Sequence, residues 1–330
     1  MSDTLKIRLT IIAALVCASS VALALACGMG IRQAPLRVAV VGLSGPATND
    51  DQAQAALQAA LARSAQITLI DPAQIKPAVA GVGYDGSINM SRDEARRLGA
   101  AIGCDFFIIG KRDLFTRSEA KAESHEEALA GVMIVDARTG ELAAFDFINE
   151  KAATRAAAIE ALTNALAARA ARYVERMVAH RARRDAAPSP GEMAERVEDL
   201  PDAESAAGAG FKPPEFLNRV KPEYTAEAER ADITATVEAS AIFRADATVG
   251  EITIMRWAGF GLDEAAARTI RQLKFKPARR DGQPVSVRAT VRYNFRRVSE
   301  PEERRGDAAT RRRGERTRSD AAMGRWGDEE

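Results

Sequence analysis

The sequence predicts an α/β domain with a mixed sheet, followed by a small α+β domain. Over residues 35–182, short apolar strands alternate with alanine-rich helical segments, and a hairpin precedes a long helix. Over residues 216–298, the pattern gives a helix, two strands, a helix and a strand. Residues 183–215 lie between these regions and are poor in large apolar side chains, which is typical of a flexible linker.

The composition is that of a folded protein without many membrane spans. The chain has 330 residues, of which 46% are hydrophobic and 28% charged, enough for two ordinary domains. A net charge of +1 and an aromatic content of 5% do not indicate nucleic-acid binding. The two histidines, His125 and His180, are too few for a common His-rich metal site, and no Ser/His/Asp set appears. We therefore expect no catalytic residue, cofactor or metal.

The first 34 residues predict the compartment. Leu9 to Ile31 carries no charge, and about 20 apolar residues suffice to cross a bilayer. Ala24-Leu25-Ala26 resembles a signal-peptide cleavage site, and Cys27 is a possible lipidation site. The segment is therefore a single-pass inner-membrane anchor, a cleaved signal or a lipoprotein signal. All three place the bulk of the chain in the periplasm.

The elements of the first domain follow from its hydrophobic pattern. The β-branched apolar run Leu36–Leu43 predicts a buried strand. Ser91 and Glu94 form a capping box for a helix that ends at Gly103. Arg138-Thr139-Gly140 predicts the turn of a hairpin. The other expected elements are helices over 50–63 and 151–180 and strands over 67–71 and 104–115.

In the second domain, the hydrophobic pattern changes from helical spacing to strand alternation within a short stretch. Leu262, Ala266 and Ile270 recur at helical spacing, and Pro277 then forbids further helix. A turn at Gly282 leads into an alternating strand that ends at Phe295. Residues 299–330 mix both charge signs without an apolar pattern, and we expect a disordered charged tail.

Short apolar patterns in the first domain resemble the CsgG and LpoB-like groups of periplasmic lipoprotein domains. The patterns are LRVAVVGL from Leu36, GAAIGCDFFIIGK from Gly99 and DARTGEL from Asp136. The resemblance implies a protein-binding or assembly module rather than a catalyst.

Residues 217–297 resemble the C-terminal domain of the TonB family of energy transducers. The similarity covers KPEYTAEA from Lys221, the paired strands, and GFGLDEAAARTIRQLKFKPARRDGQPVSVRATVRYNF from Gly259. The resemblance implies that an aromatic residue fixes the helix end on the sheet, and that a proline and a glycine set up the last strand. The motif residues are Pro222, Tyr224, Gly261, Leu262, Phe275, Pro277 and Gly282.

The resemblance also implies a partner and a mode of binding. The open edge of the last strand would pair with a short peptide of an outer-membrane TonB-dependent receptor, which is β-strand addition. A non-enzymatic protein would then transmit energy from an inner-membrane ExbB/ExbD-type motor. The alternative is that the same strand is only a sheet edge or a dimer interface. The segment consists of Ser286, Val287, Arg288, Ala289, Thr290, Val291, Arg292, Tyr293, Asn294 and Phe295.

The sequence departs from the family pattern in four ways. The run Leu9–Ile31 lacks the histidine that engages the motor, and an α/β domain interrupts the usual long Pro-rich spacer. Ala235 and Ala247 stand where glycines are usual. The first two departures leave open a second function, a periplasmic scaffold or lipoprotein for envelope assembly without energy coupling.

Overall fold

The computed structural model describes residues 34–45, 50–118, 124–187, 197–201 and 210–297. The apolar run with Cys27 and the charged tail lie outside these residues. Within the described ranges, no helix has both the length and the apolar character needed to cross a membrane.

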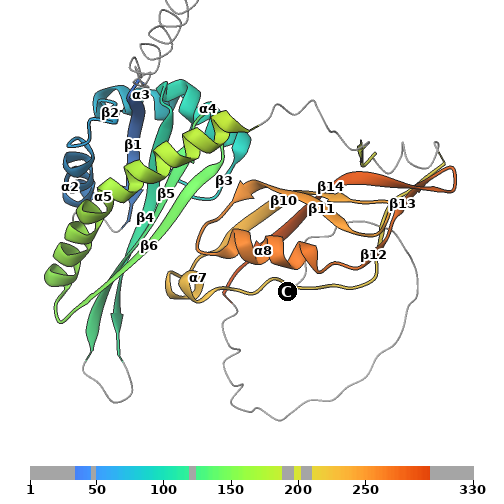
Figure 1. The fold of residues 1–330 in the computed structure, drawn as a ribbon. Helices are drawn as coiled ribbons and strands as arrows, with labels where there is room; N and C mark the ends of the chain where they lie inside the picture. The colour runs from blue at the N-terminus through green and yellow to red at the C-terminus, as the bar shows by residue number, and fades with distance from the viewer. Residues whose placement is uncertain (1–33, 46–49, 119–123, 188–196, 202–209, 298–330) are drawn as a thin grey trace, which may run out of the picture. The chain divides into compact units, whose positions relative to one another are not determined.

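The first sheet is mixed and has five strands in the order β2-β1-β4-β5-β6 (Figure 1). β1 pairs in parallel with both β2 and β4, whereas β4, β5 and β6 form an antiparallel meander. The α/β character and the hairpin predicted from the sequence are confirmed. The strands are β1 (Leu36–Ser44), β2 (Ile67–Leu69), β4 (Phe106–Arg117), β5 (His125–Asp136) and β6 (Leu142–Ala152).

Helices lie on both faces of this sheet. On one face, α2 (Asp50–Leu61) and α5 (Arg155–Ala186) form a core cluster with the strands through buried residues such as Leu57 and Leu162. On the other face, α3 (Pro72–Gly81) contributes Ile75 and α4 (Arg92–Ile102) contributes Leu98 to a second cluster. The sheet is therefore buried on both sides, which explains why β1 reads as a continuous apolar run.

Local capping fixes where two of these helices begin. At α4, the Glu94 N–H donates to the Ser91 hydroxyl and the Ser91 N–H donates to the Glu94 carboxylate, which confirms the predicted capping box. At α5, the Ala157 N–H donates to the Thr154 hydroxyl. The helix therefore starts later than the sequence predicts, because Lys151 still belongs to β6.

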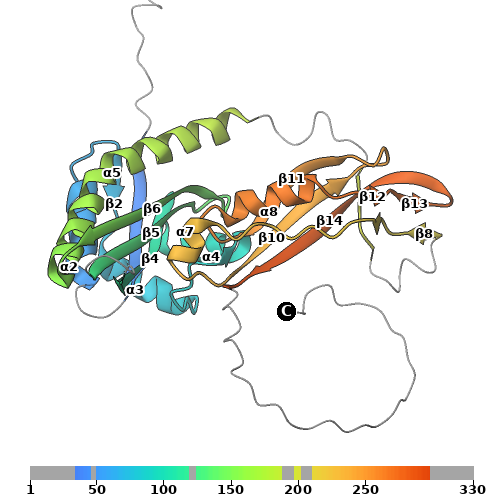
Figure 2. The same cartoon turned by 90° about the horizontal axis from the view of Figure 1, so that it is seen from below.

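The second sheet has seven strands, with the path β3-β11-β10-β14-β13-β8 and β7 paired with β14. Figure 2 shows the long strands β10, β11 and β14 with α8 beside them. The helix α8 (Leu262–Arg271) packs on β10, β11 and β14, and α7 (Ala226–Arg230) precedes them. Short strands thus add to the simple pattern that the sequence predicts. The strands are β3 (Met90–Ser91), β7 (Val197–Asp199), β8 (Phe211–Lys212), β10 (Ala235–Phe243), β11 (Val249–Trp257), β13 (Ala278–Arg280) and β14 (Gln283–Phe295), while β9 (Glu215–Phe216) pairs with β12 (Phe275–Lys276).

The two sheets share one hydrophobic cluster. Trp257 and Phe260 join the residues of α3, α4 and β5 on the second face of the first sheet. The Phe260 ring is 1% exposed, and its centroid lies 4.7 Å from that of Phe145 and 5.8 Å from that of Phe147. A Cβ on Gly131 would come within 2.4 Å of the Phe260 ring, so β5 needs glycine at this position. The first sheet thus completes its core with residues that are distant in sequence.

We expect Phe260→Ala to lower the free energy of unfolding by about 3–5 kcal/mol, because it removes a fully buried ring and leaves a cavity. Urea denaturation of the full chain measures the change. Leu217→Ala is the control, because Leu217 is 57% exposed and its loss should cost about 0.5 kcal/mol or less. Equal effects of the two substitutions would contradict the shared core.

The turn that carries Phe260 is held by a buried carboxyl group. Asp263 in the first turn of α8 is 8% exposed, and it accepts hydrogen bonds from the N–H groups of Ala258 and Gly259, both at 2.9 Å. Burial raises the pKa of Asp263 to about 7, although these two hydrogen bonds act in the opposite direction.

This pKa predicts how stability depends on pH. Between about pH 4 and pH 7, folded Asp263 keeps a proton that the unfolded chain has lost. The free energy of unfolding therefore falls as pH rises through this window, by up to about 1.4 kcal/mol per pH unit. Asp263→Asn should flatten the slope in urea denaturation, whereas Glu264→Gln at the neighbouring exposed carboxyl should retain it. An unchanged slope in Asp263→Asn would refute the assignment.

Candidate functional site

The predicted partner-binding segment lies entirely within β14. One edge of this strand pairs antiparallel with β10, from Val287 opposite Phe243 to Phe295 opposite Ala235. Arg288, Thr290 and Arg292 are exposed, whereas the alternate residues from Val287 to Phe295 are half-buried or buried. The apolar side chains of the strand belong to the core cluster that includes Ile270 of α8. β14 therefore has one solvated face and one buried face.

The other edge of β14 is only partly occupied. β13 covers its first residues, and β7 follows opposite Ser286–Arg288. The Leu200 N–H donates to the Arg288 carbonyl at 3.1 Å. Backbone groups of alternate residues point to the same edge, so those of Thr290 and Arg292 point the same way as the Arg288 carbonyl. No strand of the described ranges pairs with Ala289–Tyr293 on this edge.

The occupant β7 comes from the segment that the sequence predicts as a linker. It runs parallel to β14, with Val197, Glu198 and Asp199 opposite Ser286, Val287 and Arg288. Arg280 donates to the Glu198 carboxylate from Nε at 2.9 Å and from Nη2 at 2.7 Å, and Arg288 lies 3.2 Å from Asp199. The available sequence signal is a valine followed by two acids, which is too short to predict a strand.

The other predicted motif residues build the core beneath this edge. Phe275 is 4% exposed, and its ring meets Phe243 edge-on at a centroid distance of 5.0 Å. Pro277 separates β12 from β13, and Gly282 lies in the turn between β13 and β14. These positions hold the helix end and direct the chain into β14.

The remaining motif residues lie around the two helices. Gly261 caps α8 with φ of 72°, a backbone conformation that favours glycine, and Leu262 is fully buried. The Tyr224 hydroxyl donates toward the Ile233 carbonyl at 2.7 Å, which ties the segment before α7 to the start of β10. Pro222 lies in the same segment and is half-buried. None of these residues contributes a polar group to the β14 edge, so their role is structural.

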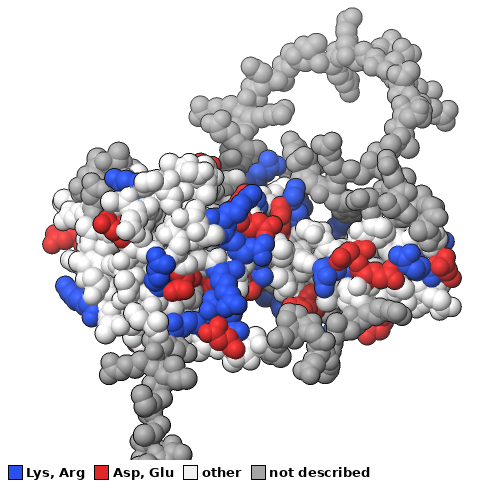
Figure 3. Space-filling view, turned by 90° about the horizontal axis from the view of Figure 1, so that it is seen from above, with Lys and Arg blue, Asp and Glu red and all other residues white. Residues whose placement is uncertain are grey.

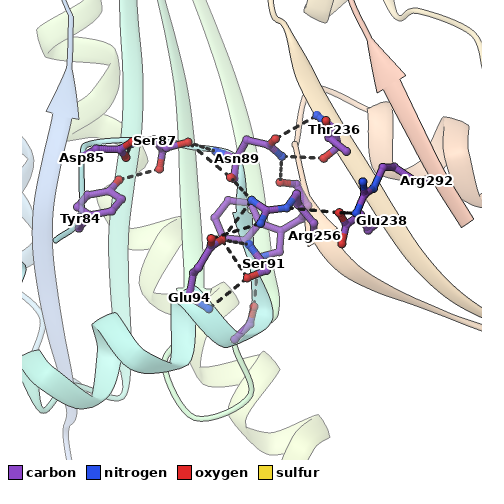
Figure 4. A network of polar contacts seen from close by, with 12 residues as sticks. Tyr84, Asp85, Ser87, Asn89, Ser91, Glu94, Thr236, Glu238, Arg256 and Arg292 are labelled. Atoms are coloured by element: carbon purple, nitrogen blue, oxygen red, sulfur yellow. Dashed lines mark hydrogen bonds and ion pairs between the residues drawn. The ribbon is translucent and has the colours of Figure 1, made fainter. Parts of the chain in front are cut away.

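A polar network that the sequence does not reveal connects β14 with the start of α4 (Figure 4). Arg292 lies 2.8 Å from Glu238 on β10, which is 3.9 Å from Arg256 on β11. Arg256 in turn contacts Glu94 at 3.1 Å and donates to the Asn89 carbonyl at 2.9 Å. The solvated face of β14 is thereby linked to the cap of α4.

This network also shifts the pKa of its carboxyl group on α4. Burial raises the pKa of Glu94, but hydrogen bonds from Ser91 and Arg256 and the positive charge of Arg256 outweigh it. The pKa of Glu94 therefore lies below its ordinary value, and the group stays charged opposite Arg256.

Asn89 holds the other edge of the second sheet. Its side-chain NH₂ donates to the Thr236 carbonyl at 2.8 Å and to the Trp257 carbonyl at 2.7 Å. Its side-chain carbonyl accepts from the Thr236 N–H at 3.0 Å. One side chain thus satisfies backbone groups on β10 and β11, next to the point where β3 pairs with β11.

The surface shown in Figure 3 carries basic side chains beside acidic ones. Ion pairs of the described residues include Arg92–Glu141 at 2.8 Å and Arg184–Asp136 at 2.7 Å. Among these residues, no group of three or more His, Cys, Asp and Glu side chains has the arrangement of a metal site. The edge of β14 remains the candidate site, because it carries the segment that the sequence predicts and no described strand pairs with Ala289–Tyr293 there.

We expect Asn89→Ala to lower the free energy of unfolding by about 2–4 kcal/mol, because it leaves partly buried backbone groups of β10 and β11 without partners. Asn218→Ala is a matched control, since Asn218 also bonds backbone groups of Gln272 and Lys274, but at exposed positions. Water can replace those contacts, and the cost should be about 1 kcal/mol or less. Urea denaturation of both variants measures the two losses in the free energy of unfolding. Equal losses would contradict a special role of Asn89.

The solved structures to which the chain is similar match it at low identity and low TM-score. The LpoB C-terminal domain from Salmonella enterica is 17% identical, covering 35% of this chain and 82% of that chain with a TM-score of 0.26. The hypothetical protein CT253 from Chlamydia trachomatis is 15% identical, covering 43% and 98% with a TM-score of 0.32. The Pseudomonas aeruginosa TonB CTD is 20% identical, covering 34% and 100% with a TM-score of 0.24.

A comparison with curated proteins gives no match. Part of the second sheet, in contrast, matches a family model. Residues 220–296, which include β10, β11, α8 and β14, match the family model of the Gram-negative bacterial TonB protein C-terminal.

Proposed function

We propose that this chain is a non-enzymatic periplasmic protein of the TonB type, and that β14 binds an extended peptide of an outer-membrane receptor by strand addition. The match to the TonB C-terminal model supports the kind of domain. The observation that carries the proposal is the edge of β14 from Ala289 to Tyr293, which no described strand covers.

The edge has the properties that strand addition requires. The N–H and C=O groups of Thr290 and Arg292 point outward, and their donors and acceptors suit an extended partner. The opposite edge of β14 is paired with β10 over the same residues, so the acceptor strand is already held in an extended conformation. Main-chain hydrogen bonds supply most of the affinity, and the exposed side chains of Arg288 and Arg292 supply selectivity.

The proposal includes anchoring and energy transfer. The apolar run Leu9–Ile31 would hold the chain in the inner membrane, and an ExbB/ExbD-type motor would act on it. Because the run has no histidine, motor contact needs a separate test, which is crosslinking of the full chain to such motor proteins in cells.

A second function, a periplasmic scaffold without energy coupling, is favoured by one structural observation. Trp257 and Phe260 share a core with the first sheet, so the TonB-type part is built into a larger unit rather than suspended on a spacer. Mass spectrometry of the protein purified from membranes distinguishes a membrane-spanning anchor from a lipid anchor. An acylated Cys27 at a new N-terminus would favour the scaffold function.

We expect Arg292→Pro to weaken binding of receptor N-terminal peptides at least tenfold. Proline removes the N–H donor at the centre of the open edge and disturbs the strand. Fluorescence anisotropy with labelled peptides from the receptors of the same cell measures the affinity, using the detergent-solubilised full chain.

Arg292→Ala is the matched control for this substitution. It loses the exposed ion pair with Glu238, which is worth about 0–1 kcal/mol, but it keeps the backbone donor. Its affinity should stay within about threefold of the native value. Circular dichroism and thermal unfolding establish that both variants are folded, and a folded proline variant that binds normally would rule out pairing at this edge.

A further inference from the structure

The β14 edge already pairs with a strand of the same chain, β7, and this pairing is short. β7 contributes three residues opposite Ser286–Arg288, and the hydrogen bond from Leu200 extends the ladder by one donor. The chain then reaches Pro201, the last described residue of this segment. The pairing is therefore much shorter than that of β10, which runs from Val287 to Phe295 on the other edge.

We propose that β7 is a built-in competitor for this edge, and that the partner which displaces it is an acidic extended peptide running parallel to β14. The inference rests on the proposed function, since it names the chemistry and the regulation of the same edge.

The direction proposed for the partner is that of β7. β7 pairs in parallel with β14, and in parallel pairing the carbonyl of one residue and the N–H two residues later bond the same residue of the added strand. Arg288 already accepts from Leu200 in this pattern. The outward groups of Thr290 and Arg292 continue the same row, so a longer parallel strand extends the ladder without a shift in register.

The charge of the partner follows from the contacts of β7. Arg280 makes a two-pronged contact with one oxygen of Glu198, and Arg288 pairs with Asp199. The two arginine side chains are 39% and 50% exposed, so an incoming strand can reach them once β7 has left. A peptide with acids at these positions replaces both ion pairs, whereas a basic peptide meets repulsion.

The length of the edge decides the competition. β7 covers Ser286–Arg288, while Ala289–Tyr293 has no described strand opposite it. A partner that pairs along both stretches makes more main-chain hydrogen bonds than β7 does. The partner can bind only those molecules in which β7 has left the edge, so its apparent dissociation constant is the intrinsic one divided by this free fraction. The apparent affinity is therefore about threefold to tenfold weaker if the edge is free about 10–30% of the time.

The test uses the full chain and the strand's own sequence as the probe. A labelled peptide RVEDLP, which copies residues 196–201, is titrated into native protein and into Leu200→Pro, which lacks the N–H that donates to Arg288. Leu200→Ala is the matched control because it keeps that donor. We expect Leu200→Pro to bind the probe about threefold to tenfold more tightly than native protein and Leu200→Ala. Equal affinities for all three would overturn the competition.

The charge is tested with a second probe, RVKKLP. It should bind Leu200→Pro at least tenfold more weakly than RVEDLP, and adding Arg280→Glu to this variant should reverse part of the preference. Equal binding of both peptides would overturn the acidic specificity. Amide hydrogen exchange at Arg288 and Thr290 locates the bound probe, and protection elsewhere in the chain would also overturn the proposal.

Receptor peptides separate this inference from the proposed function. If they bind native protein and Leu200→Pro with the same affinity, β7 is no competitor, although the receptor function stands. If RVEDLP shows the expected gain but no receptor peptide binds either protein, the competing strand is confirmed and the receptor function fails.

Discussion

The structure depends on the burial of one turn, Trp257 to Phe260, against the first sheet. The Trp257 indole N–H donates to the Gly140 carbonyl at 3.1 Å in the hairpin turn between β5 and β6. Phe260 has φ of 53°, which is unfavourable for a non-glycine residue by about 1–2 kcal/mol. Burial of its ring against Phe145 and Phe147 offsets that cost. Neither sheet has a complete core without this contact.

The same contact makes the two edges of the second sheet unequal. It brings β3 and Asn89 next to β11, where β3 pairs with Arg256 and Trp257. At Arg256 and Trp257 that edge is covered by backbone bonds, by the side chain of Asn89 and by the Glu94–Arg256 ion pair, whereas no described strand pairs with the rest of β11 on this side. The β14 edge has only a short strand and exposed ion pairs, together with the charged side chains that commonly protect open edges.

The sequence predicts most elements of the first sheet because each is encoded locally. The capping box at Ser91 and the hairpin turn near Gly140 depend on residues that are close in the chain, and both appear where expected. The predicted start of α5 is too early because Lys151 and Ala152 run into alanine-rich sequence of high helix propensity, whereas their pairing with β5 keeps them in β6.

Of the candidate site, the sequence predicts β14 but neither β7 nor the contacts of Asn89, because only β14 has a local pattern. β14 shows its alternation in the sequence, and resemblance to a known family pointed to its edge. β7 and the Asn89 network depend on pairing between segments far apart in the chain, such as Glu198 with Arg280 and Asn89 with Trp257. A three-residue strand and a single asparagine leave no periodic pattern, so only the folded chain reveals them.

The polar network runs from Arg292 on the solvated face of β14 to Glu94 at the start of α4. A partner that draws Arg292 toward its own acidic groups competes with Glu238 for the guanidinium. Glu238 is then left to Arg256, which is shared with Glu94 at the start of α4. Glu238 and Arg256 each have two charged partners within the network, so loss of the Arg292 contact leaves neither of them without an ion pair.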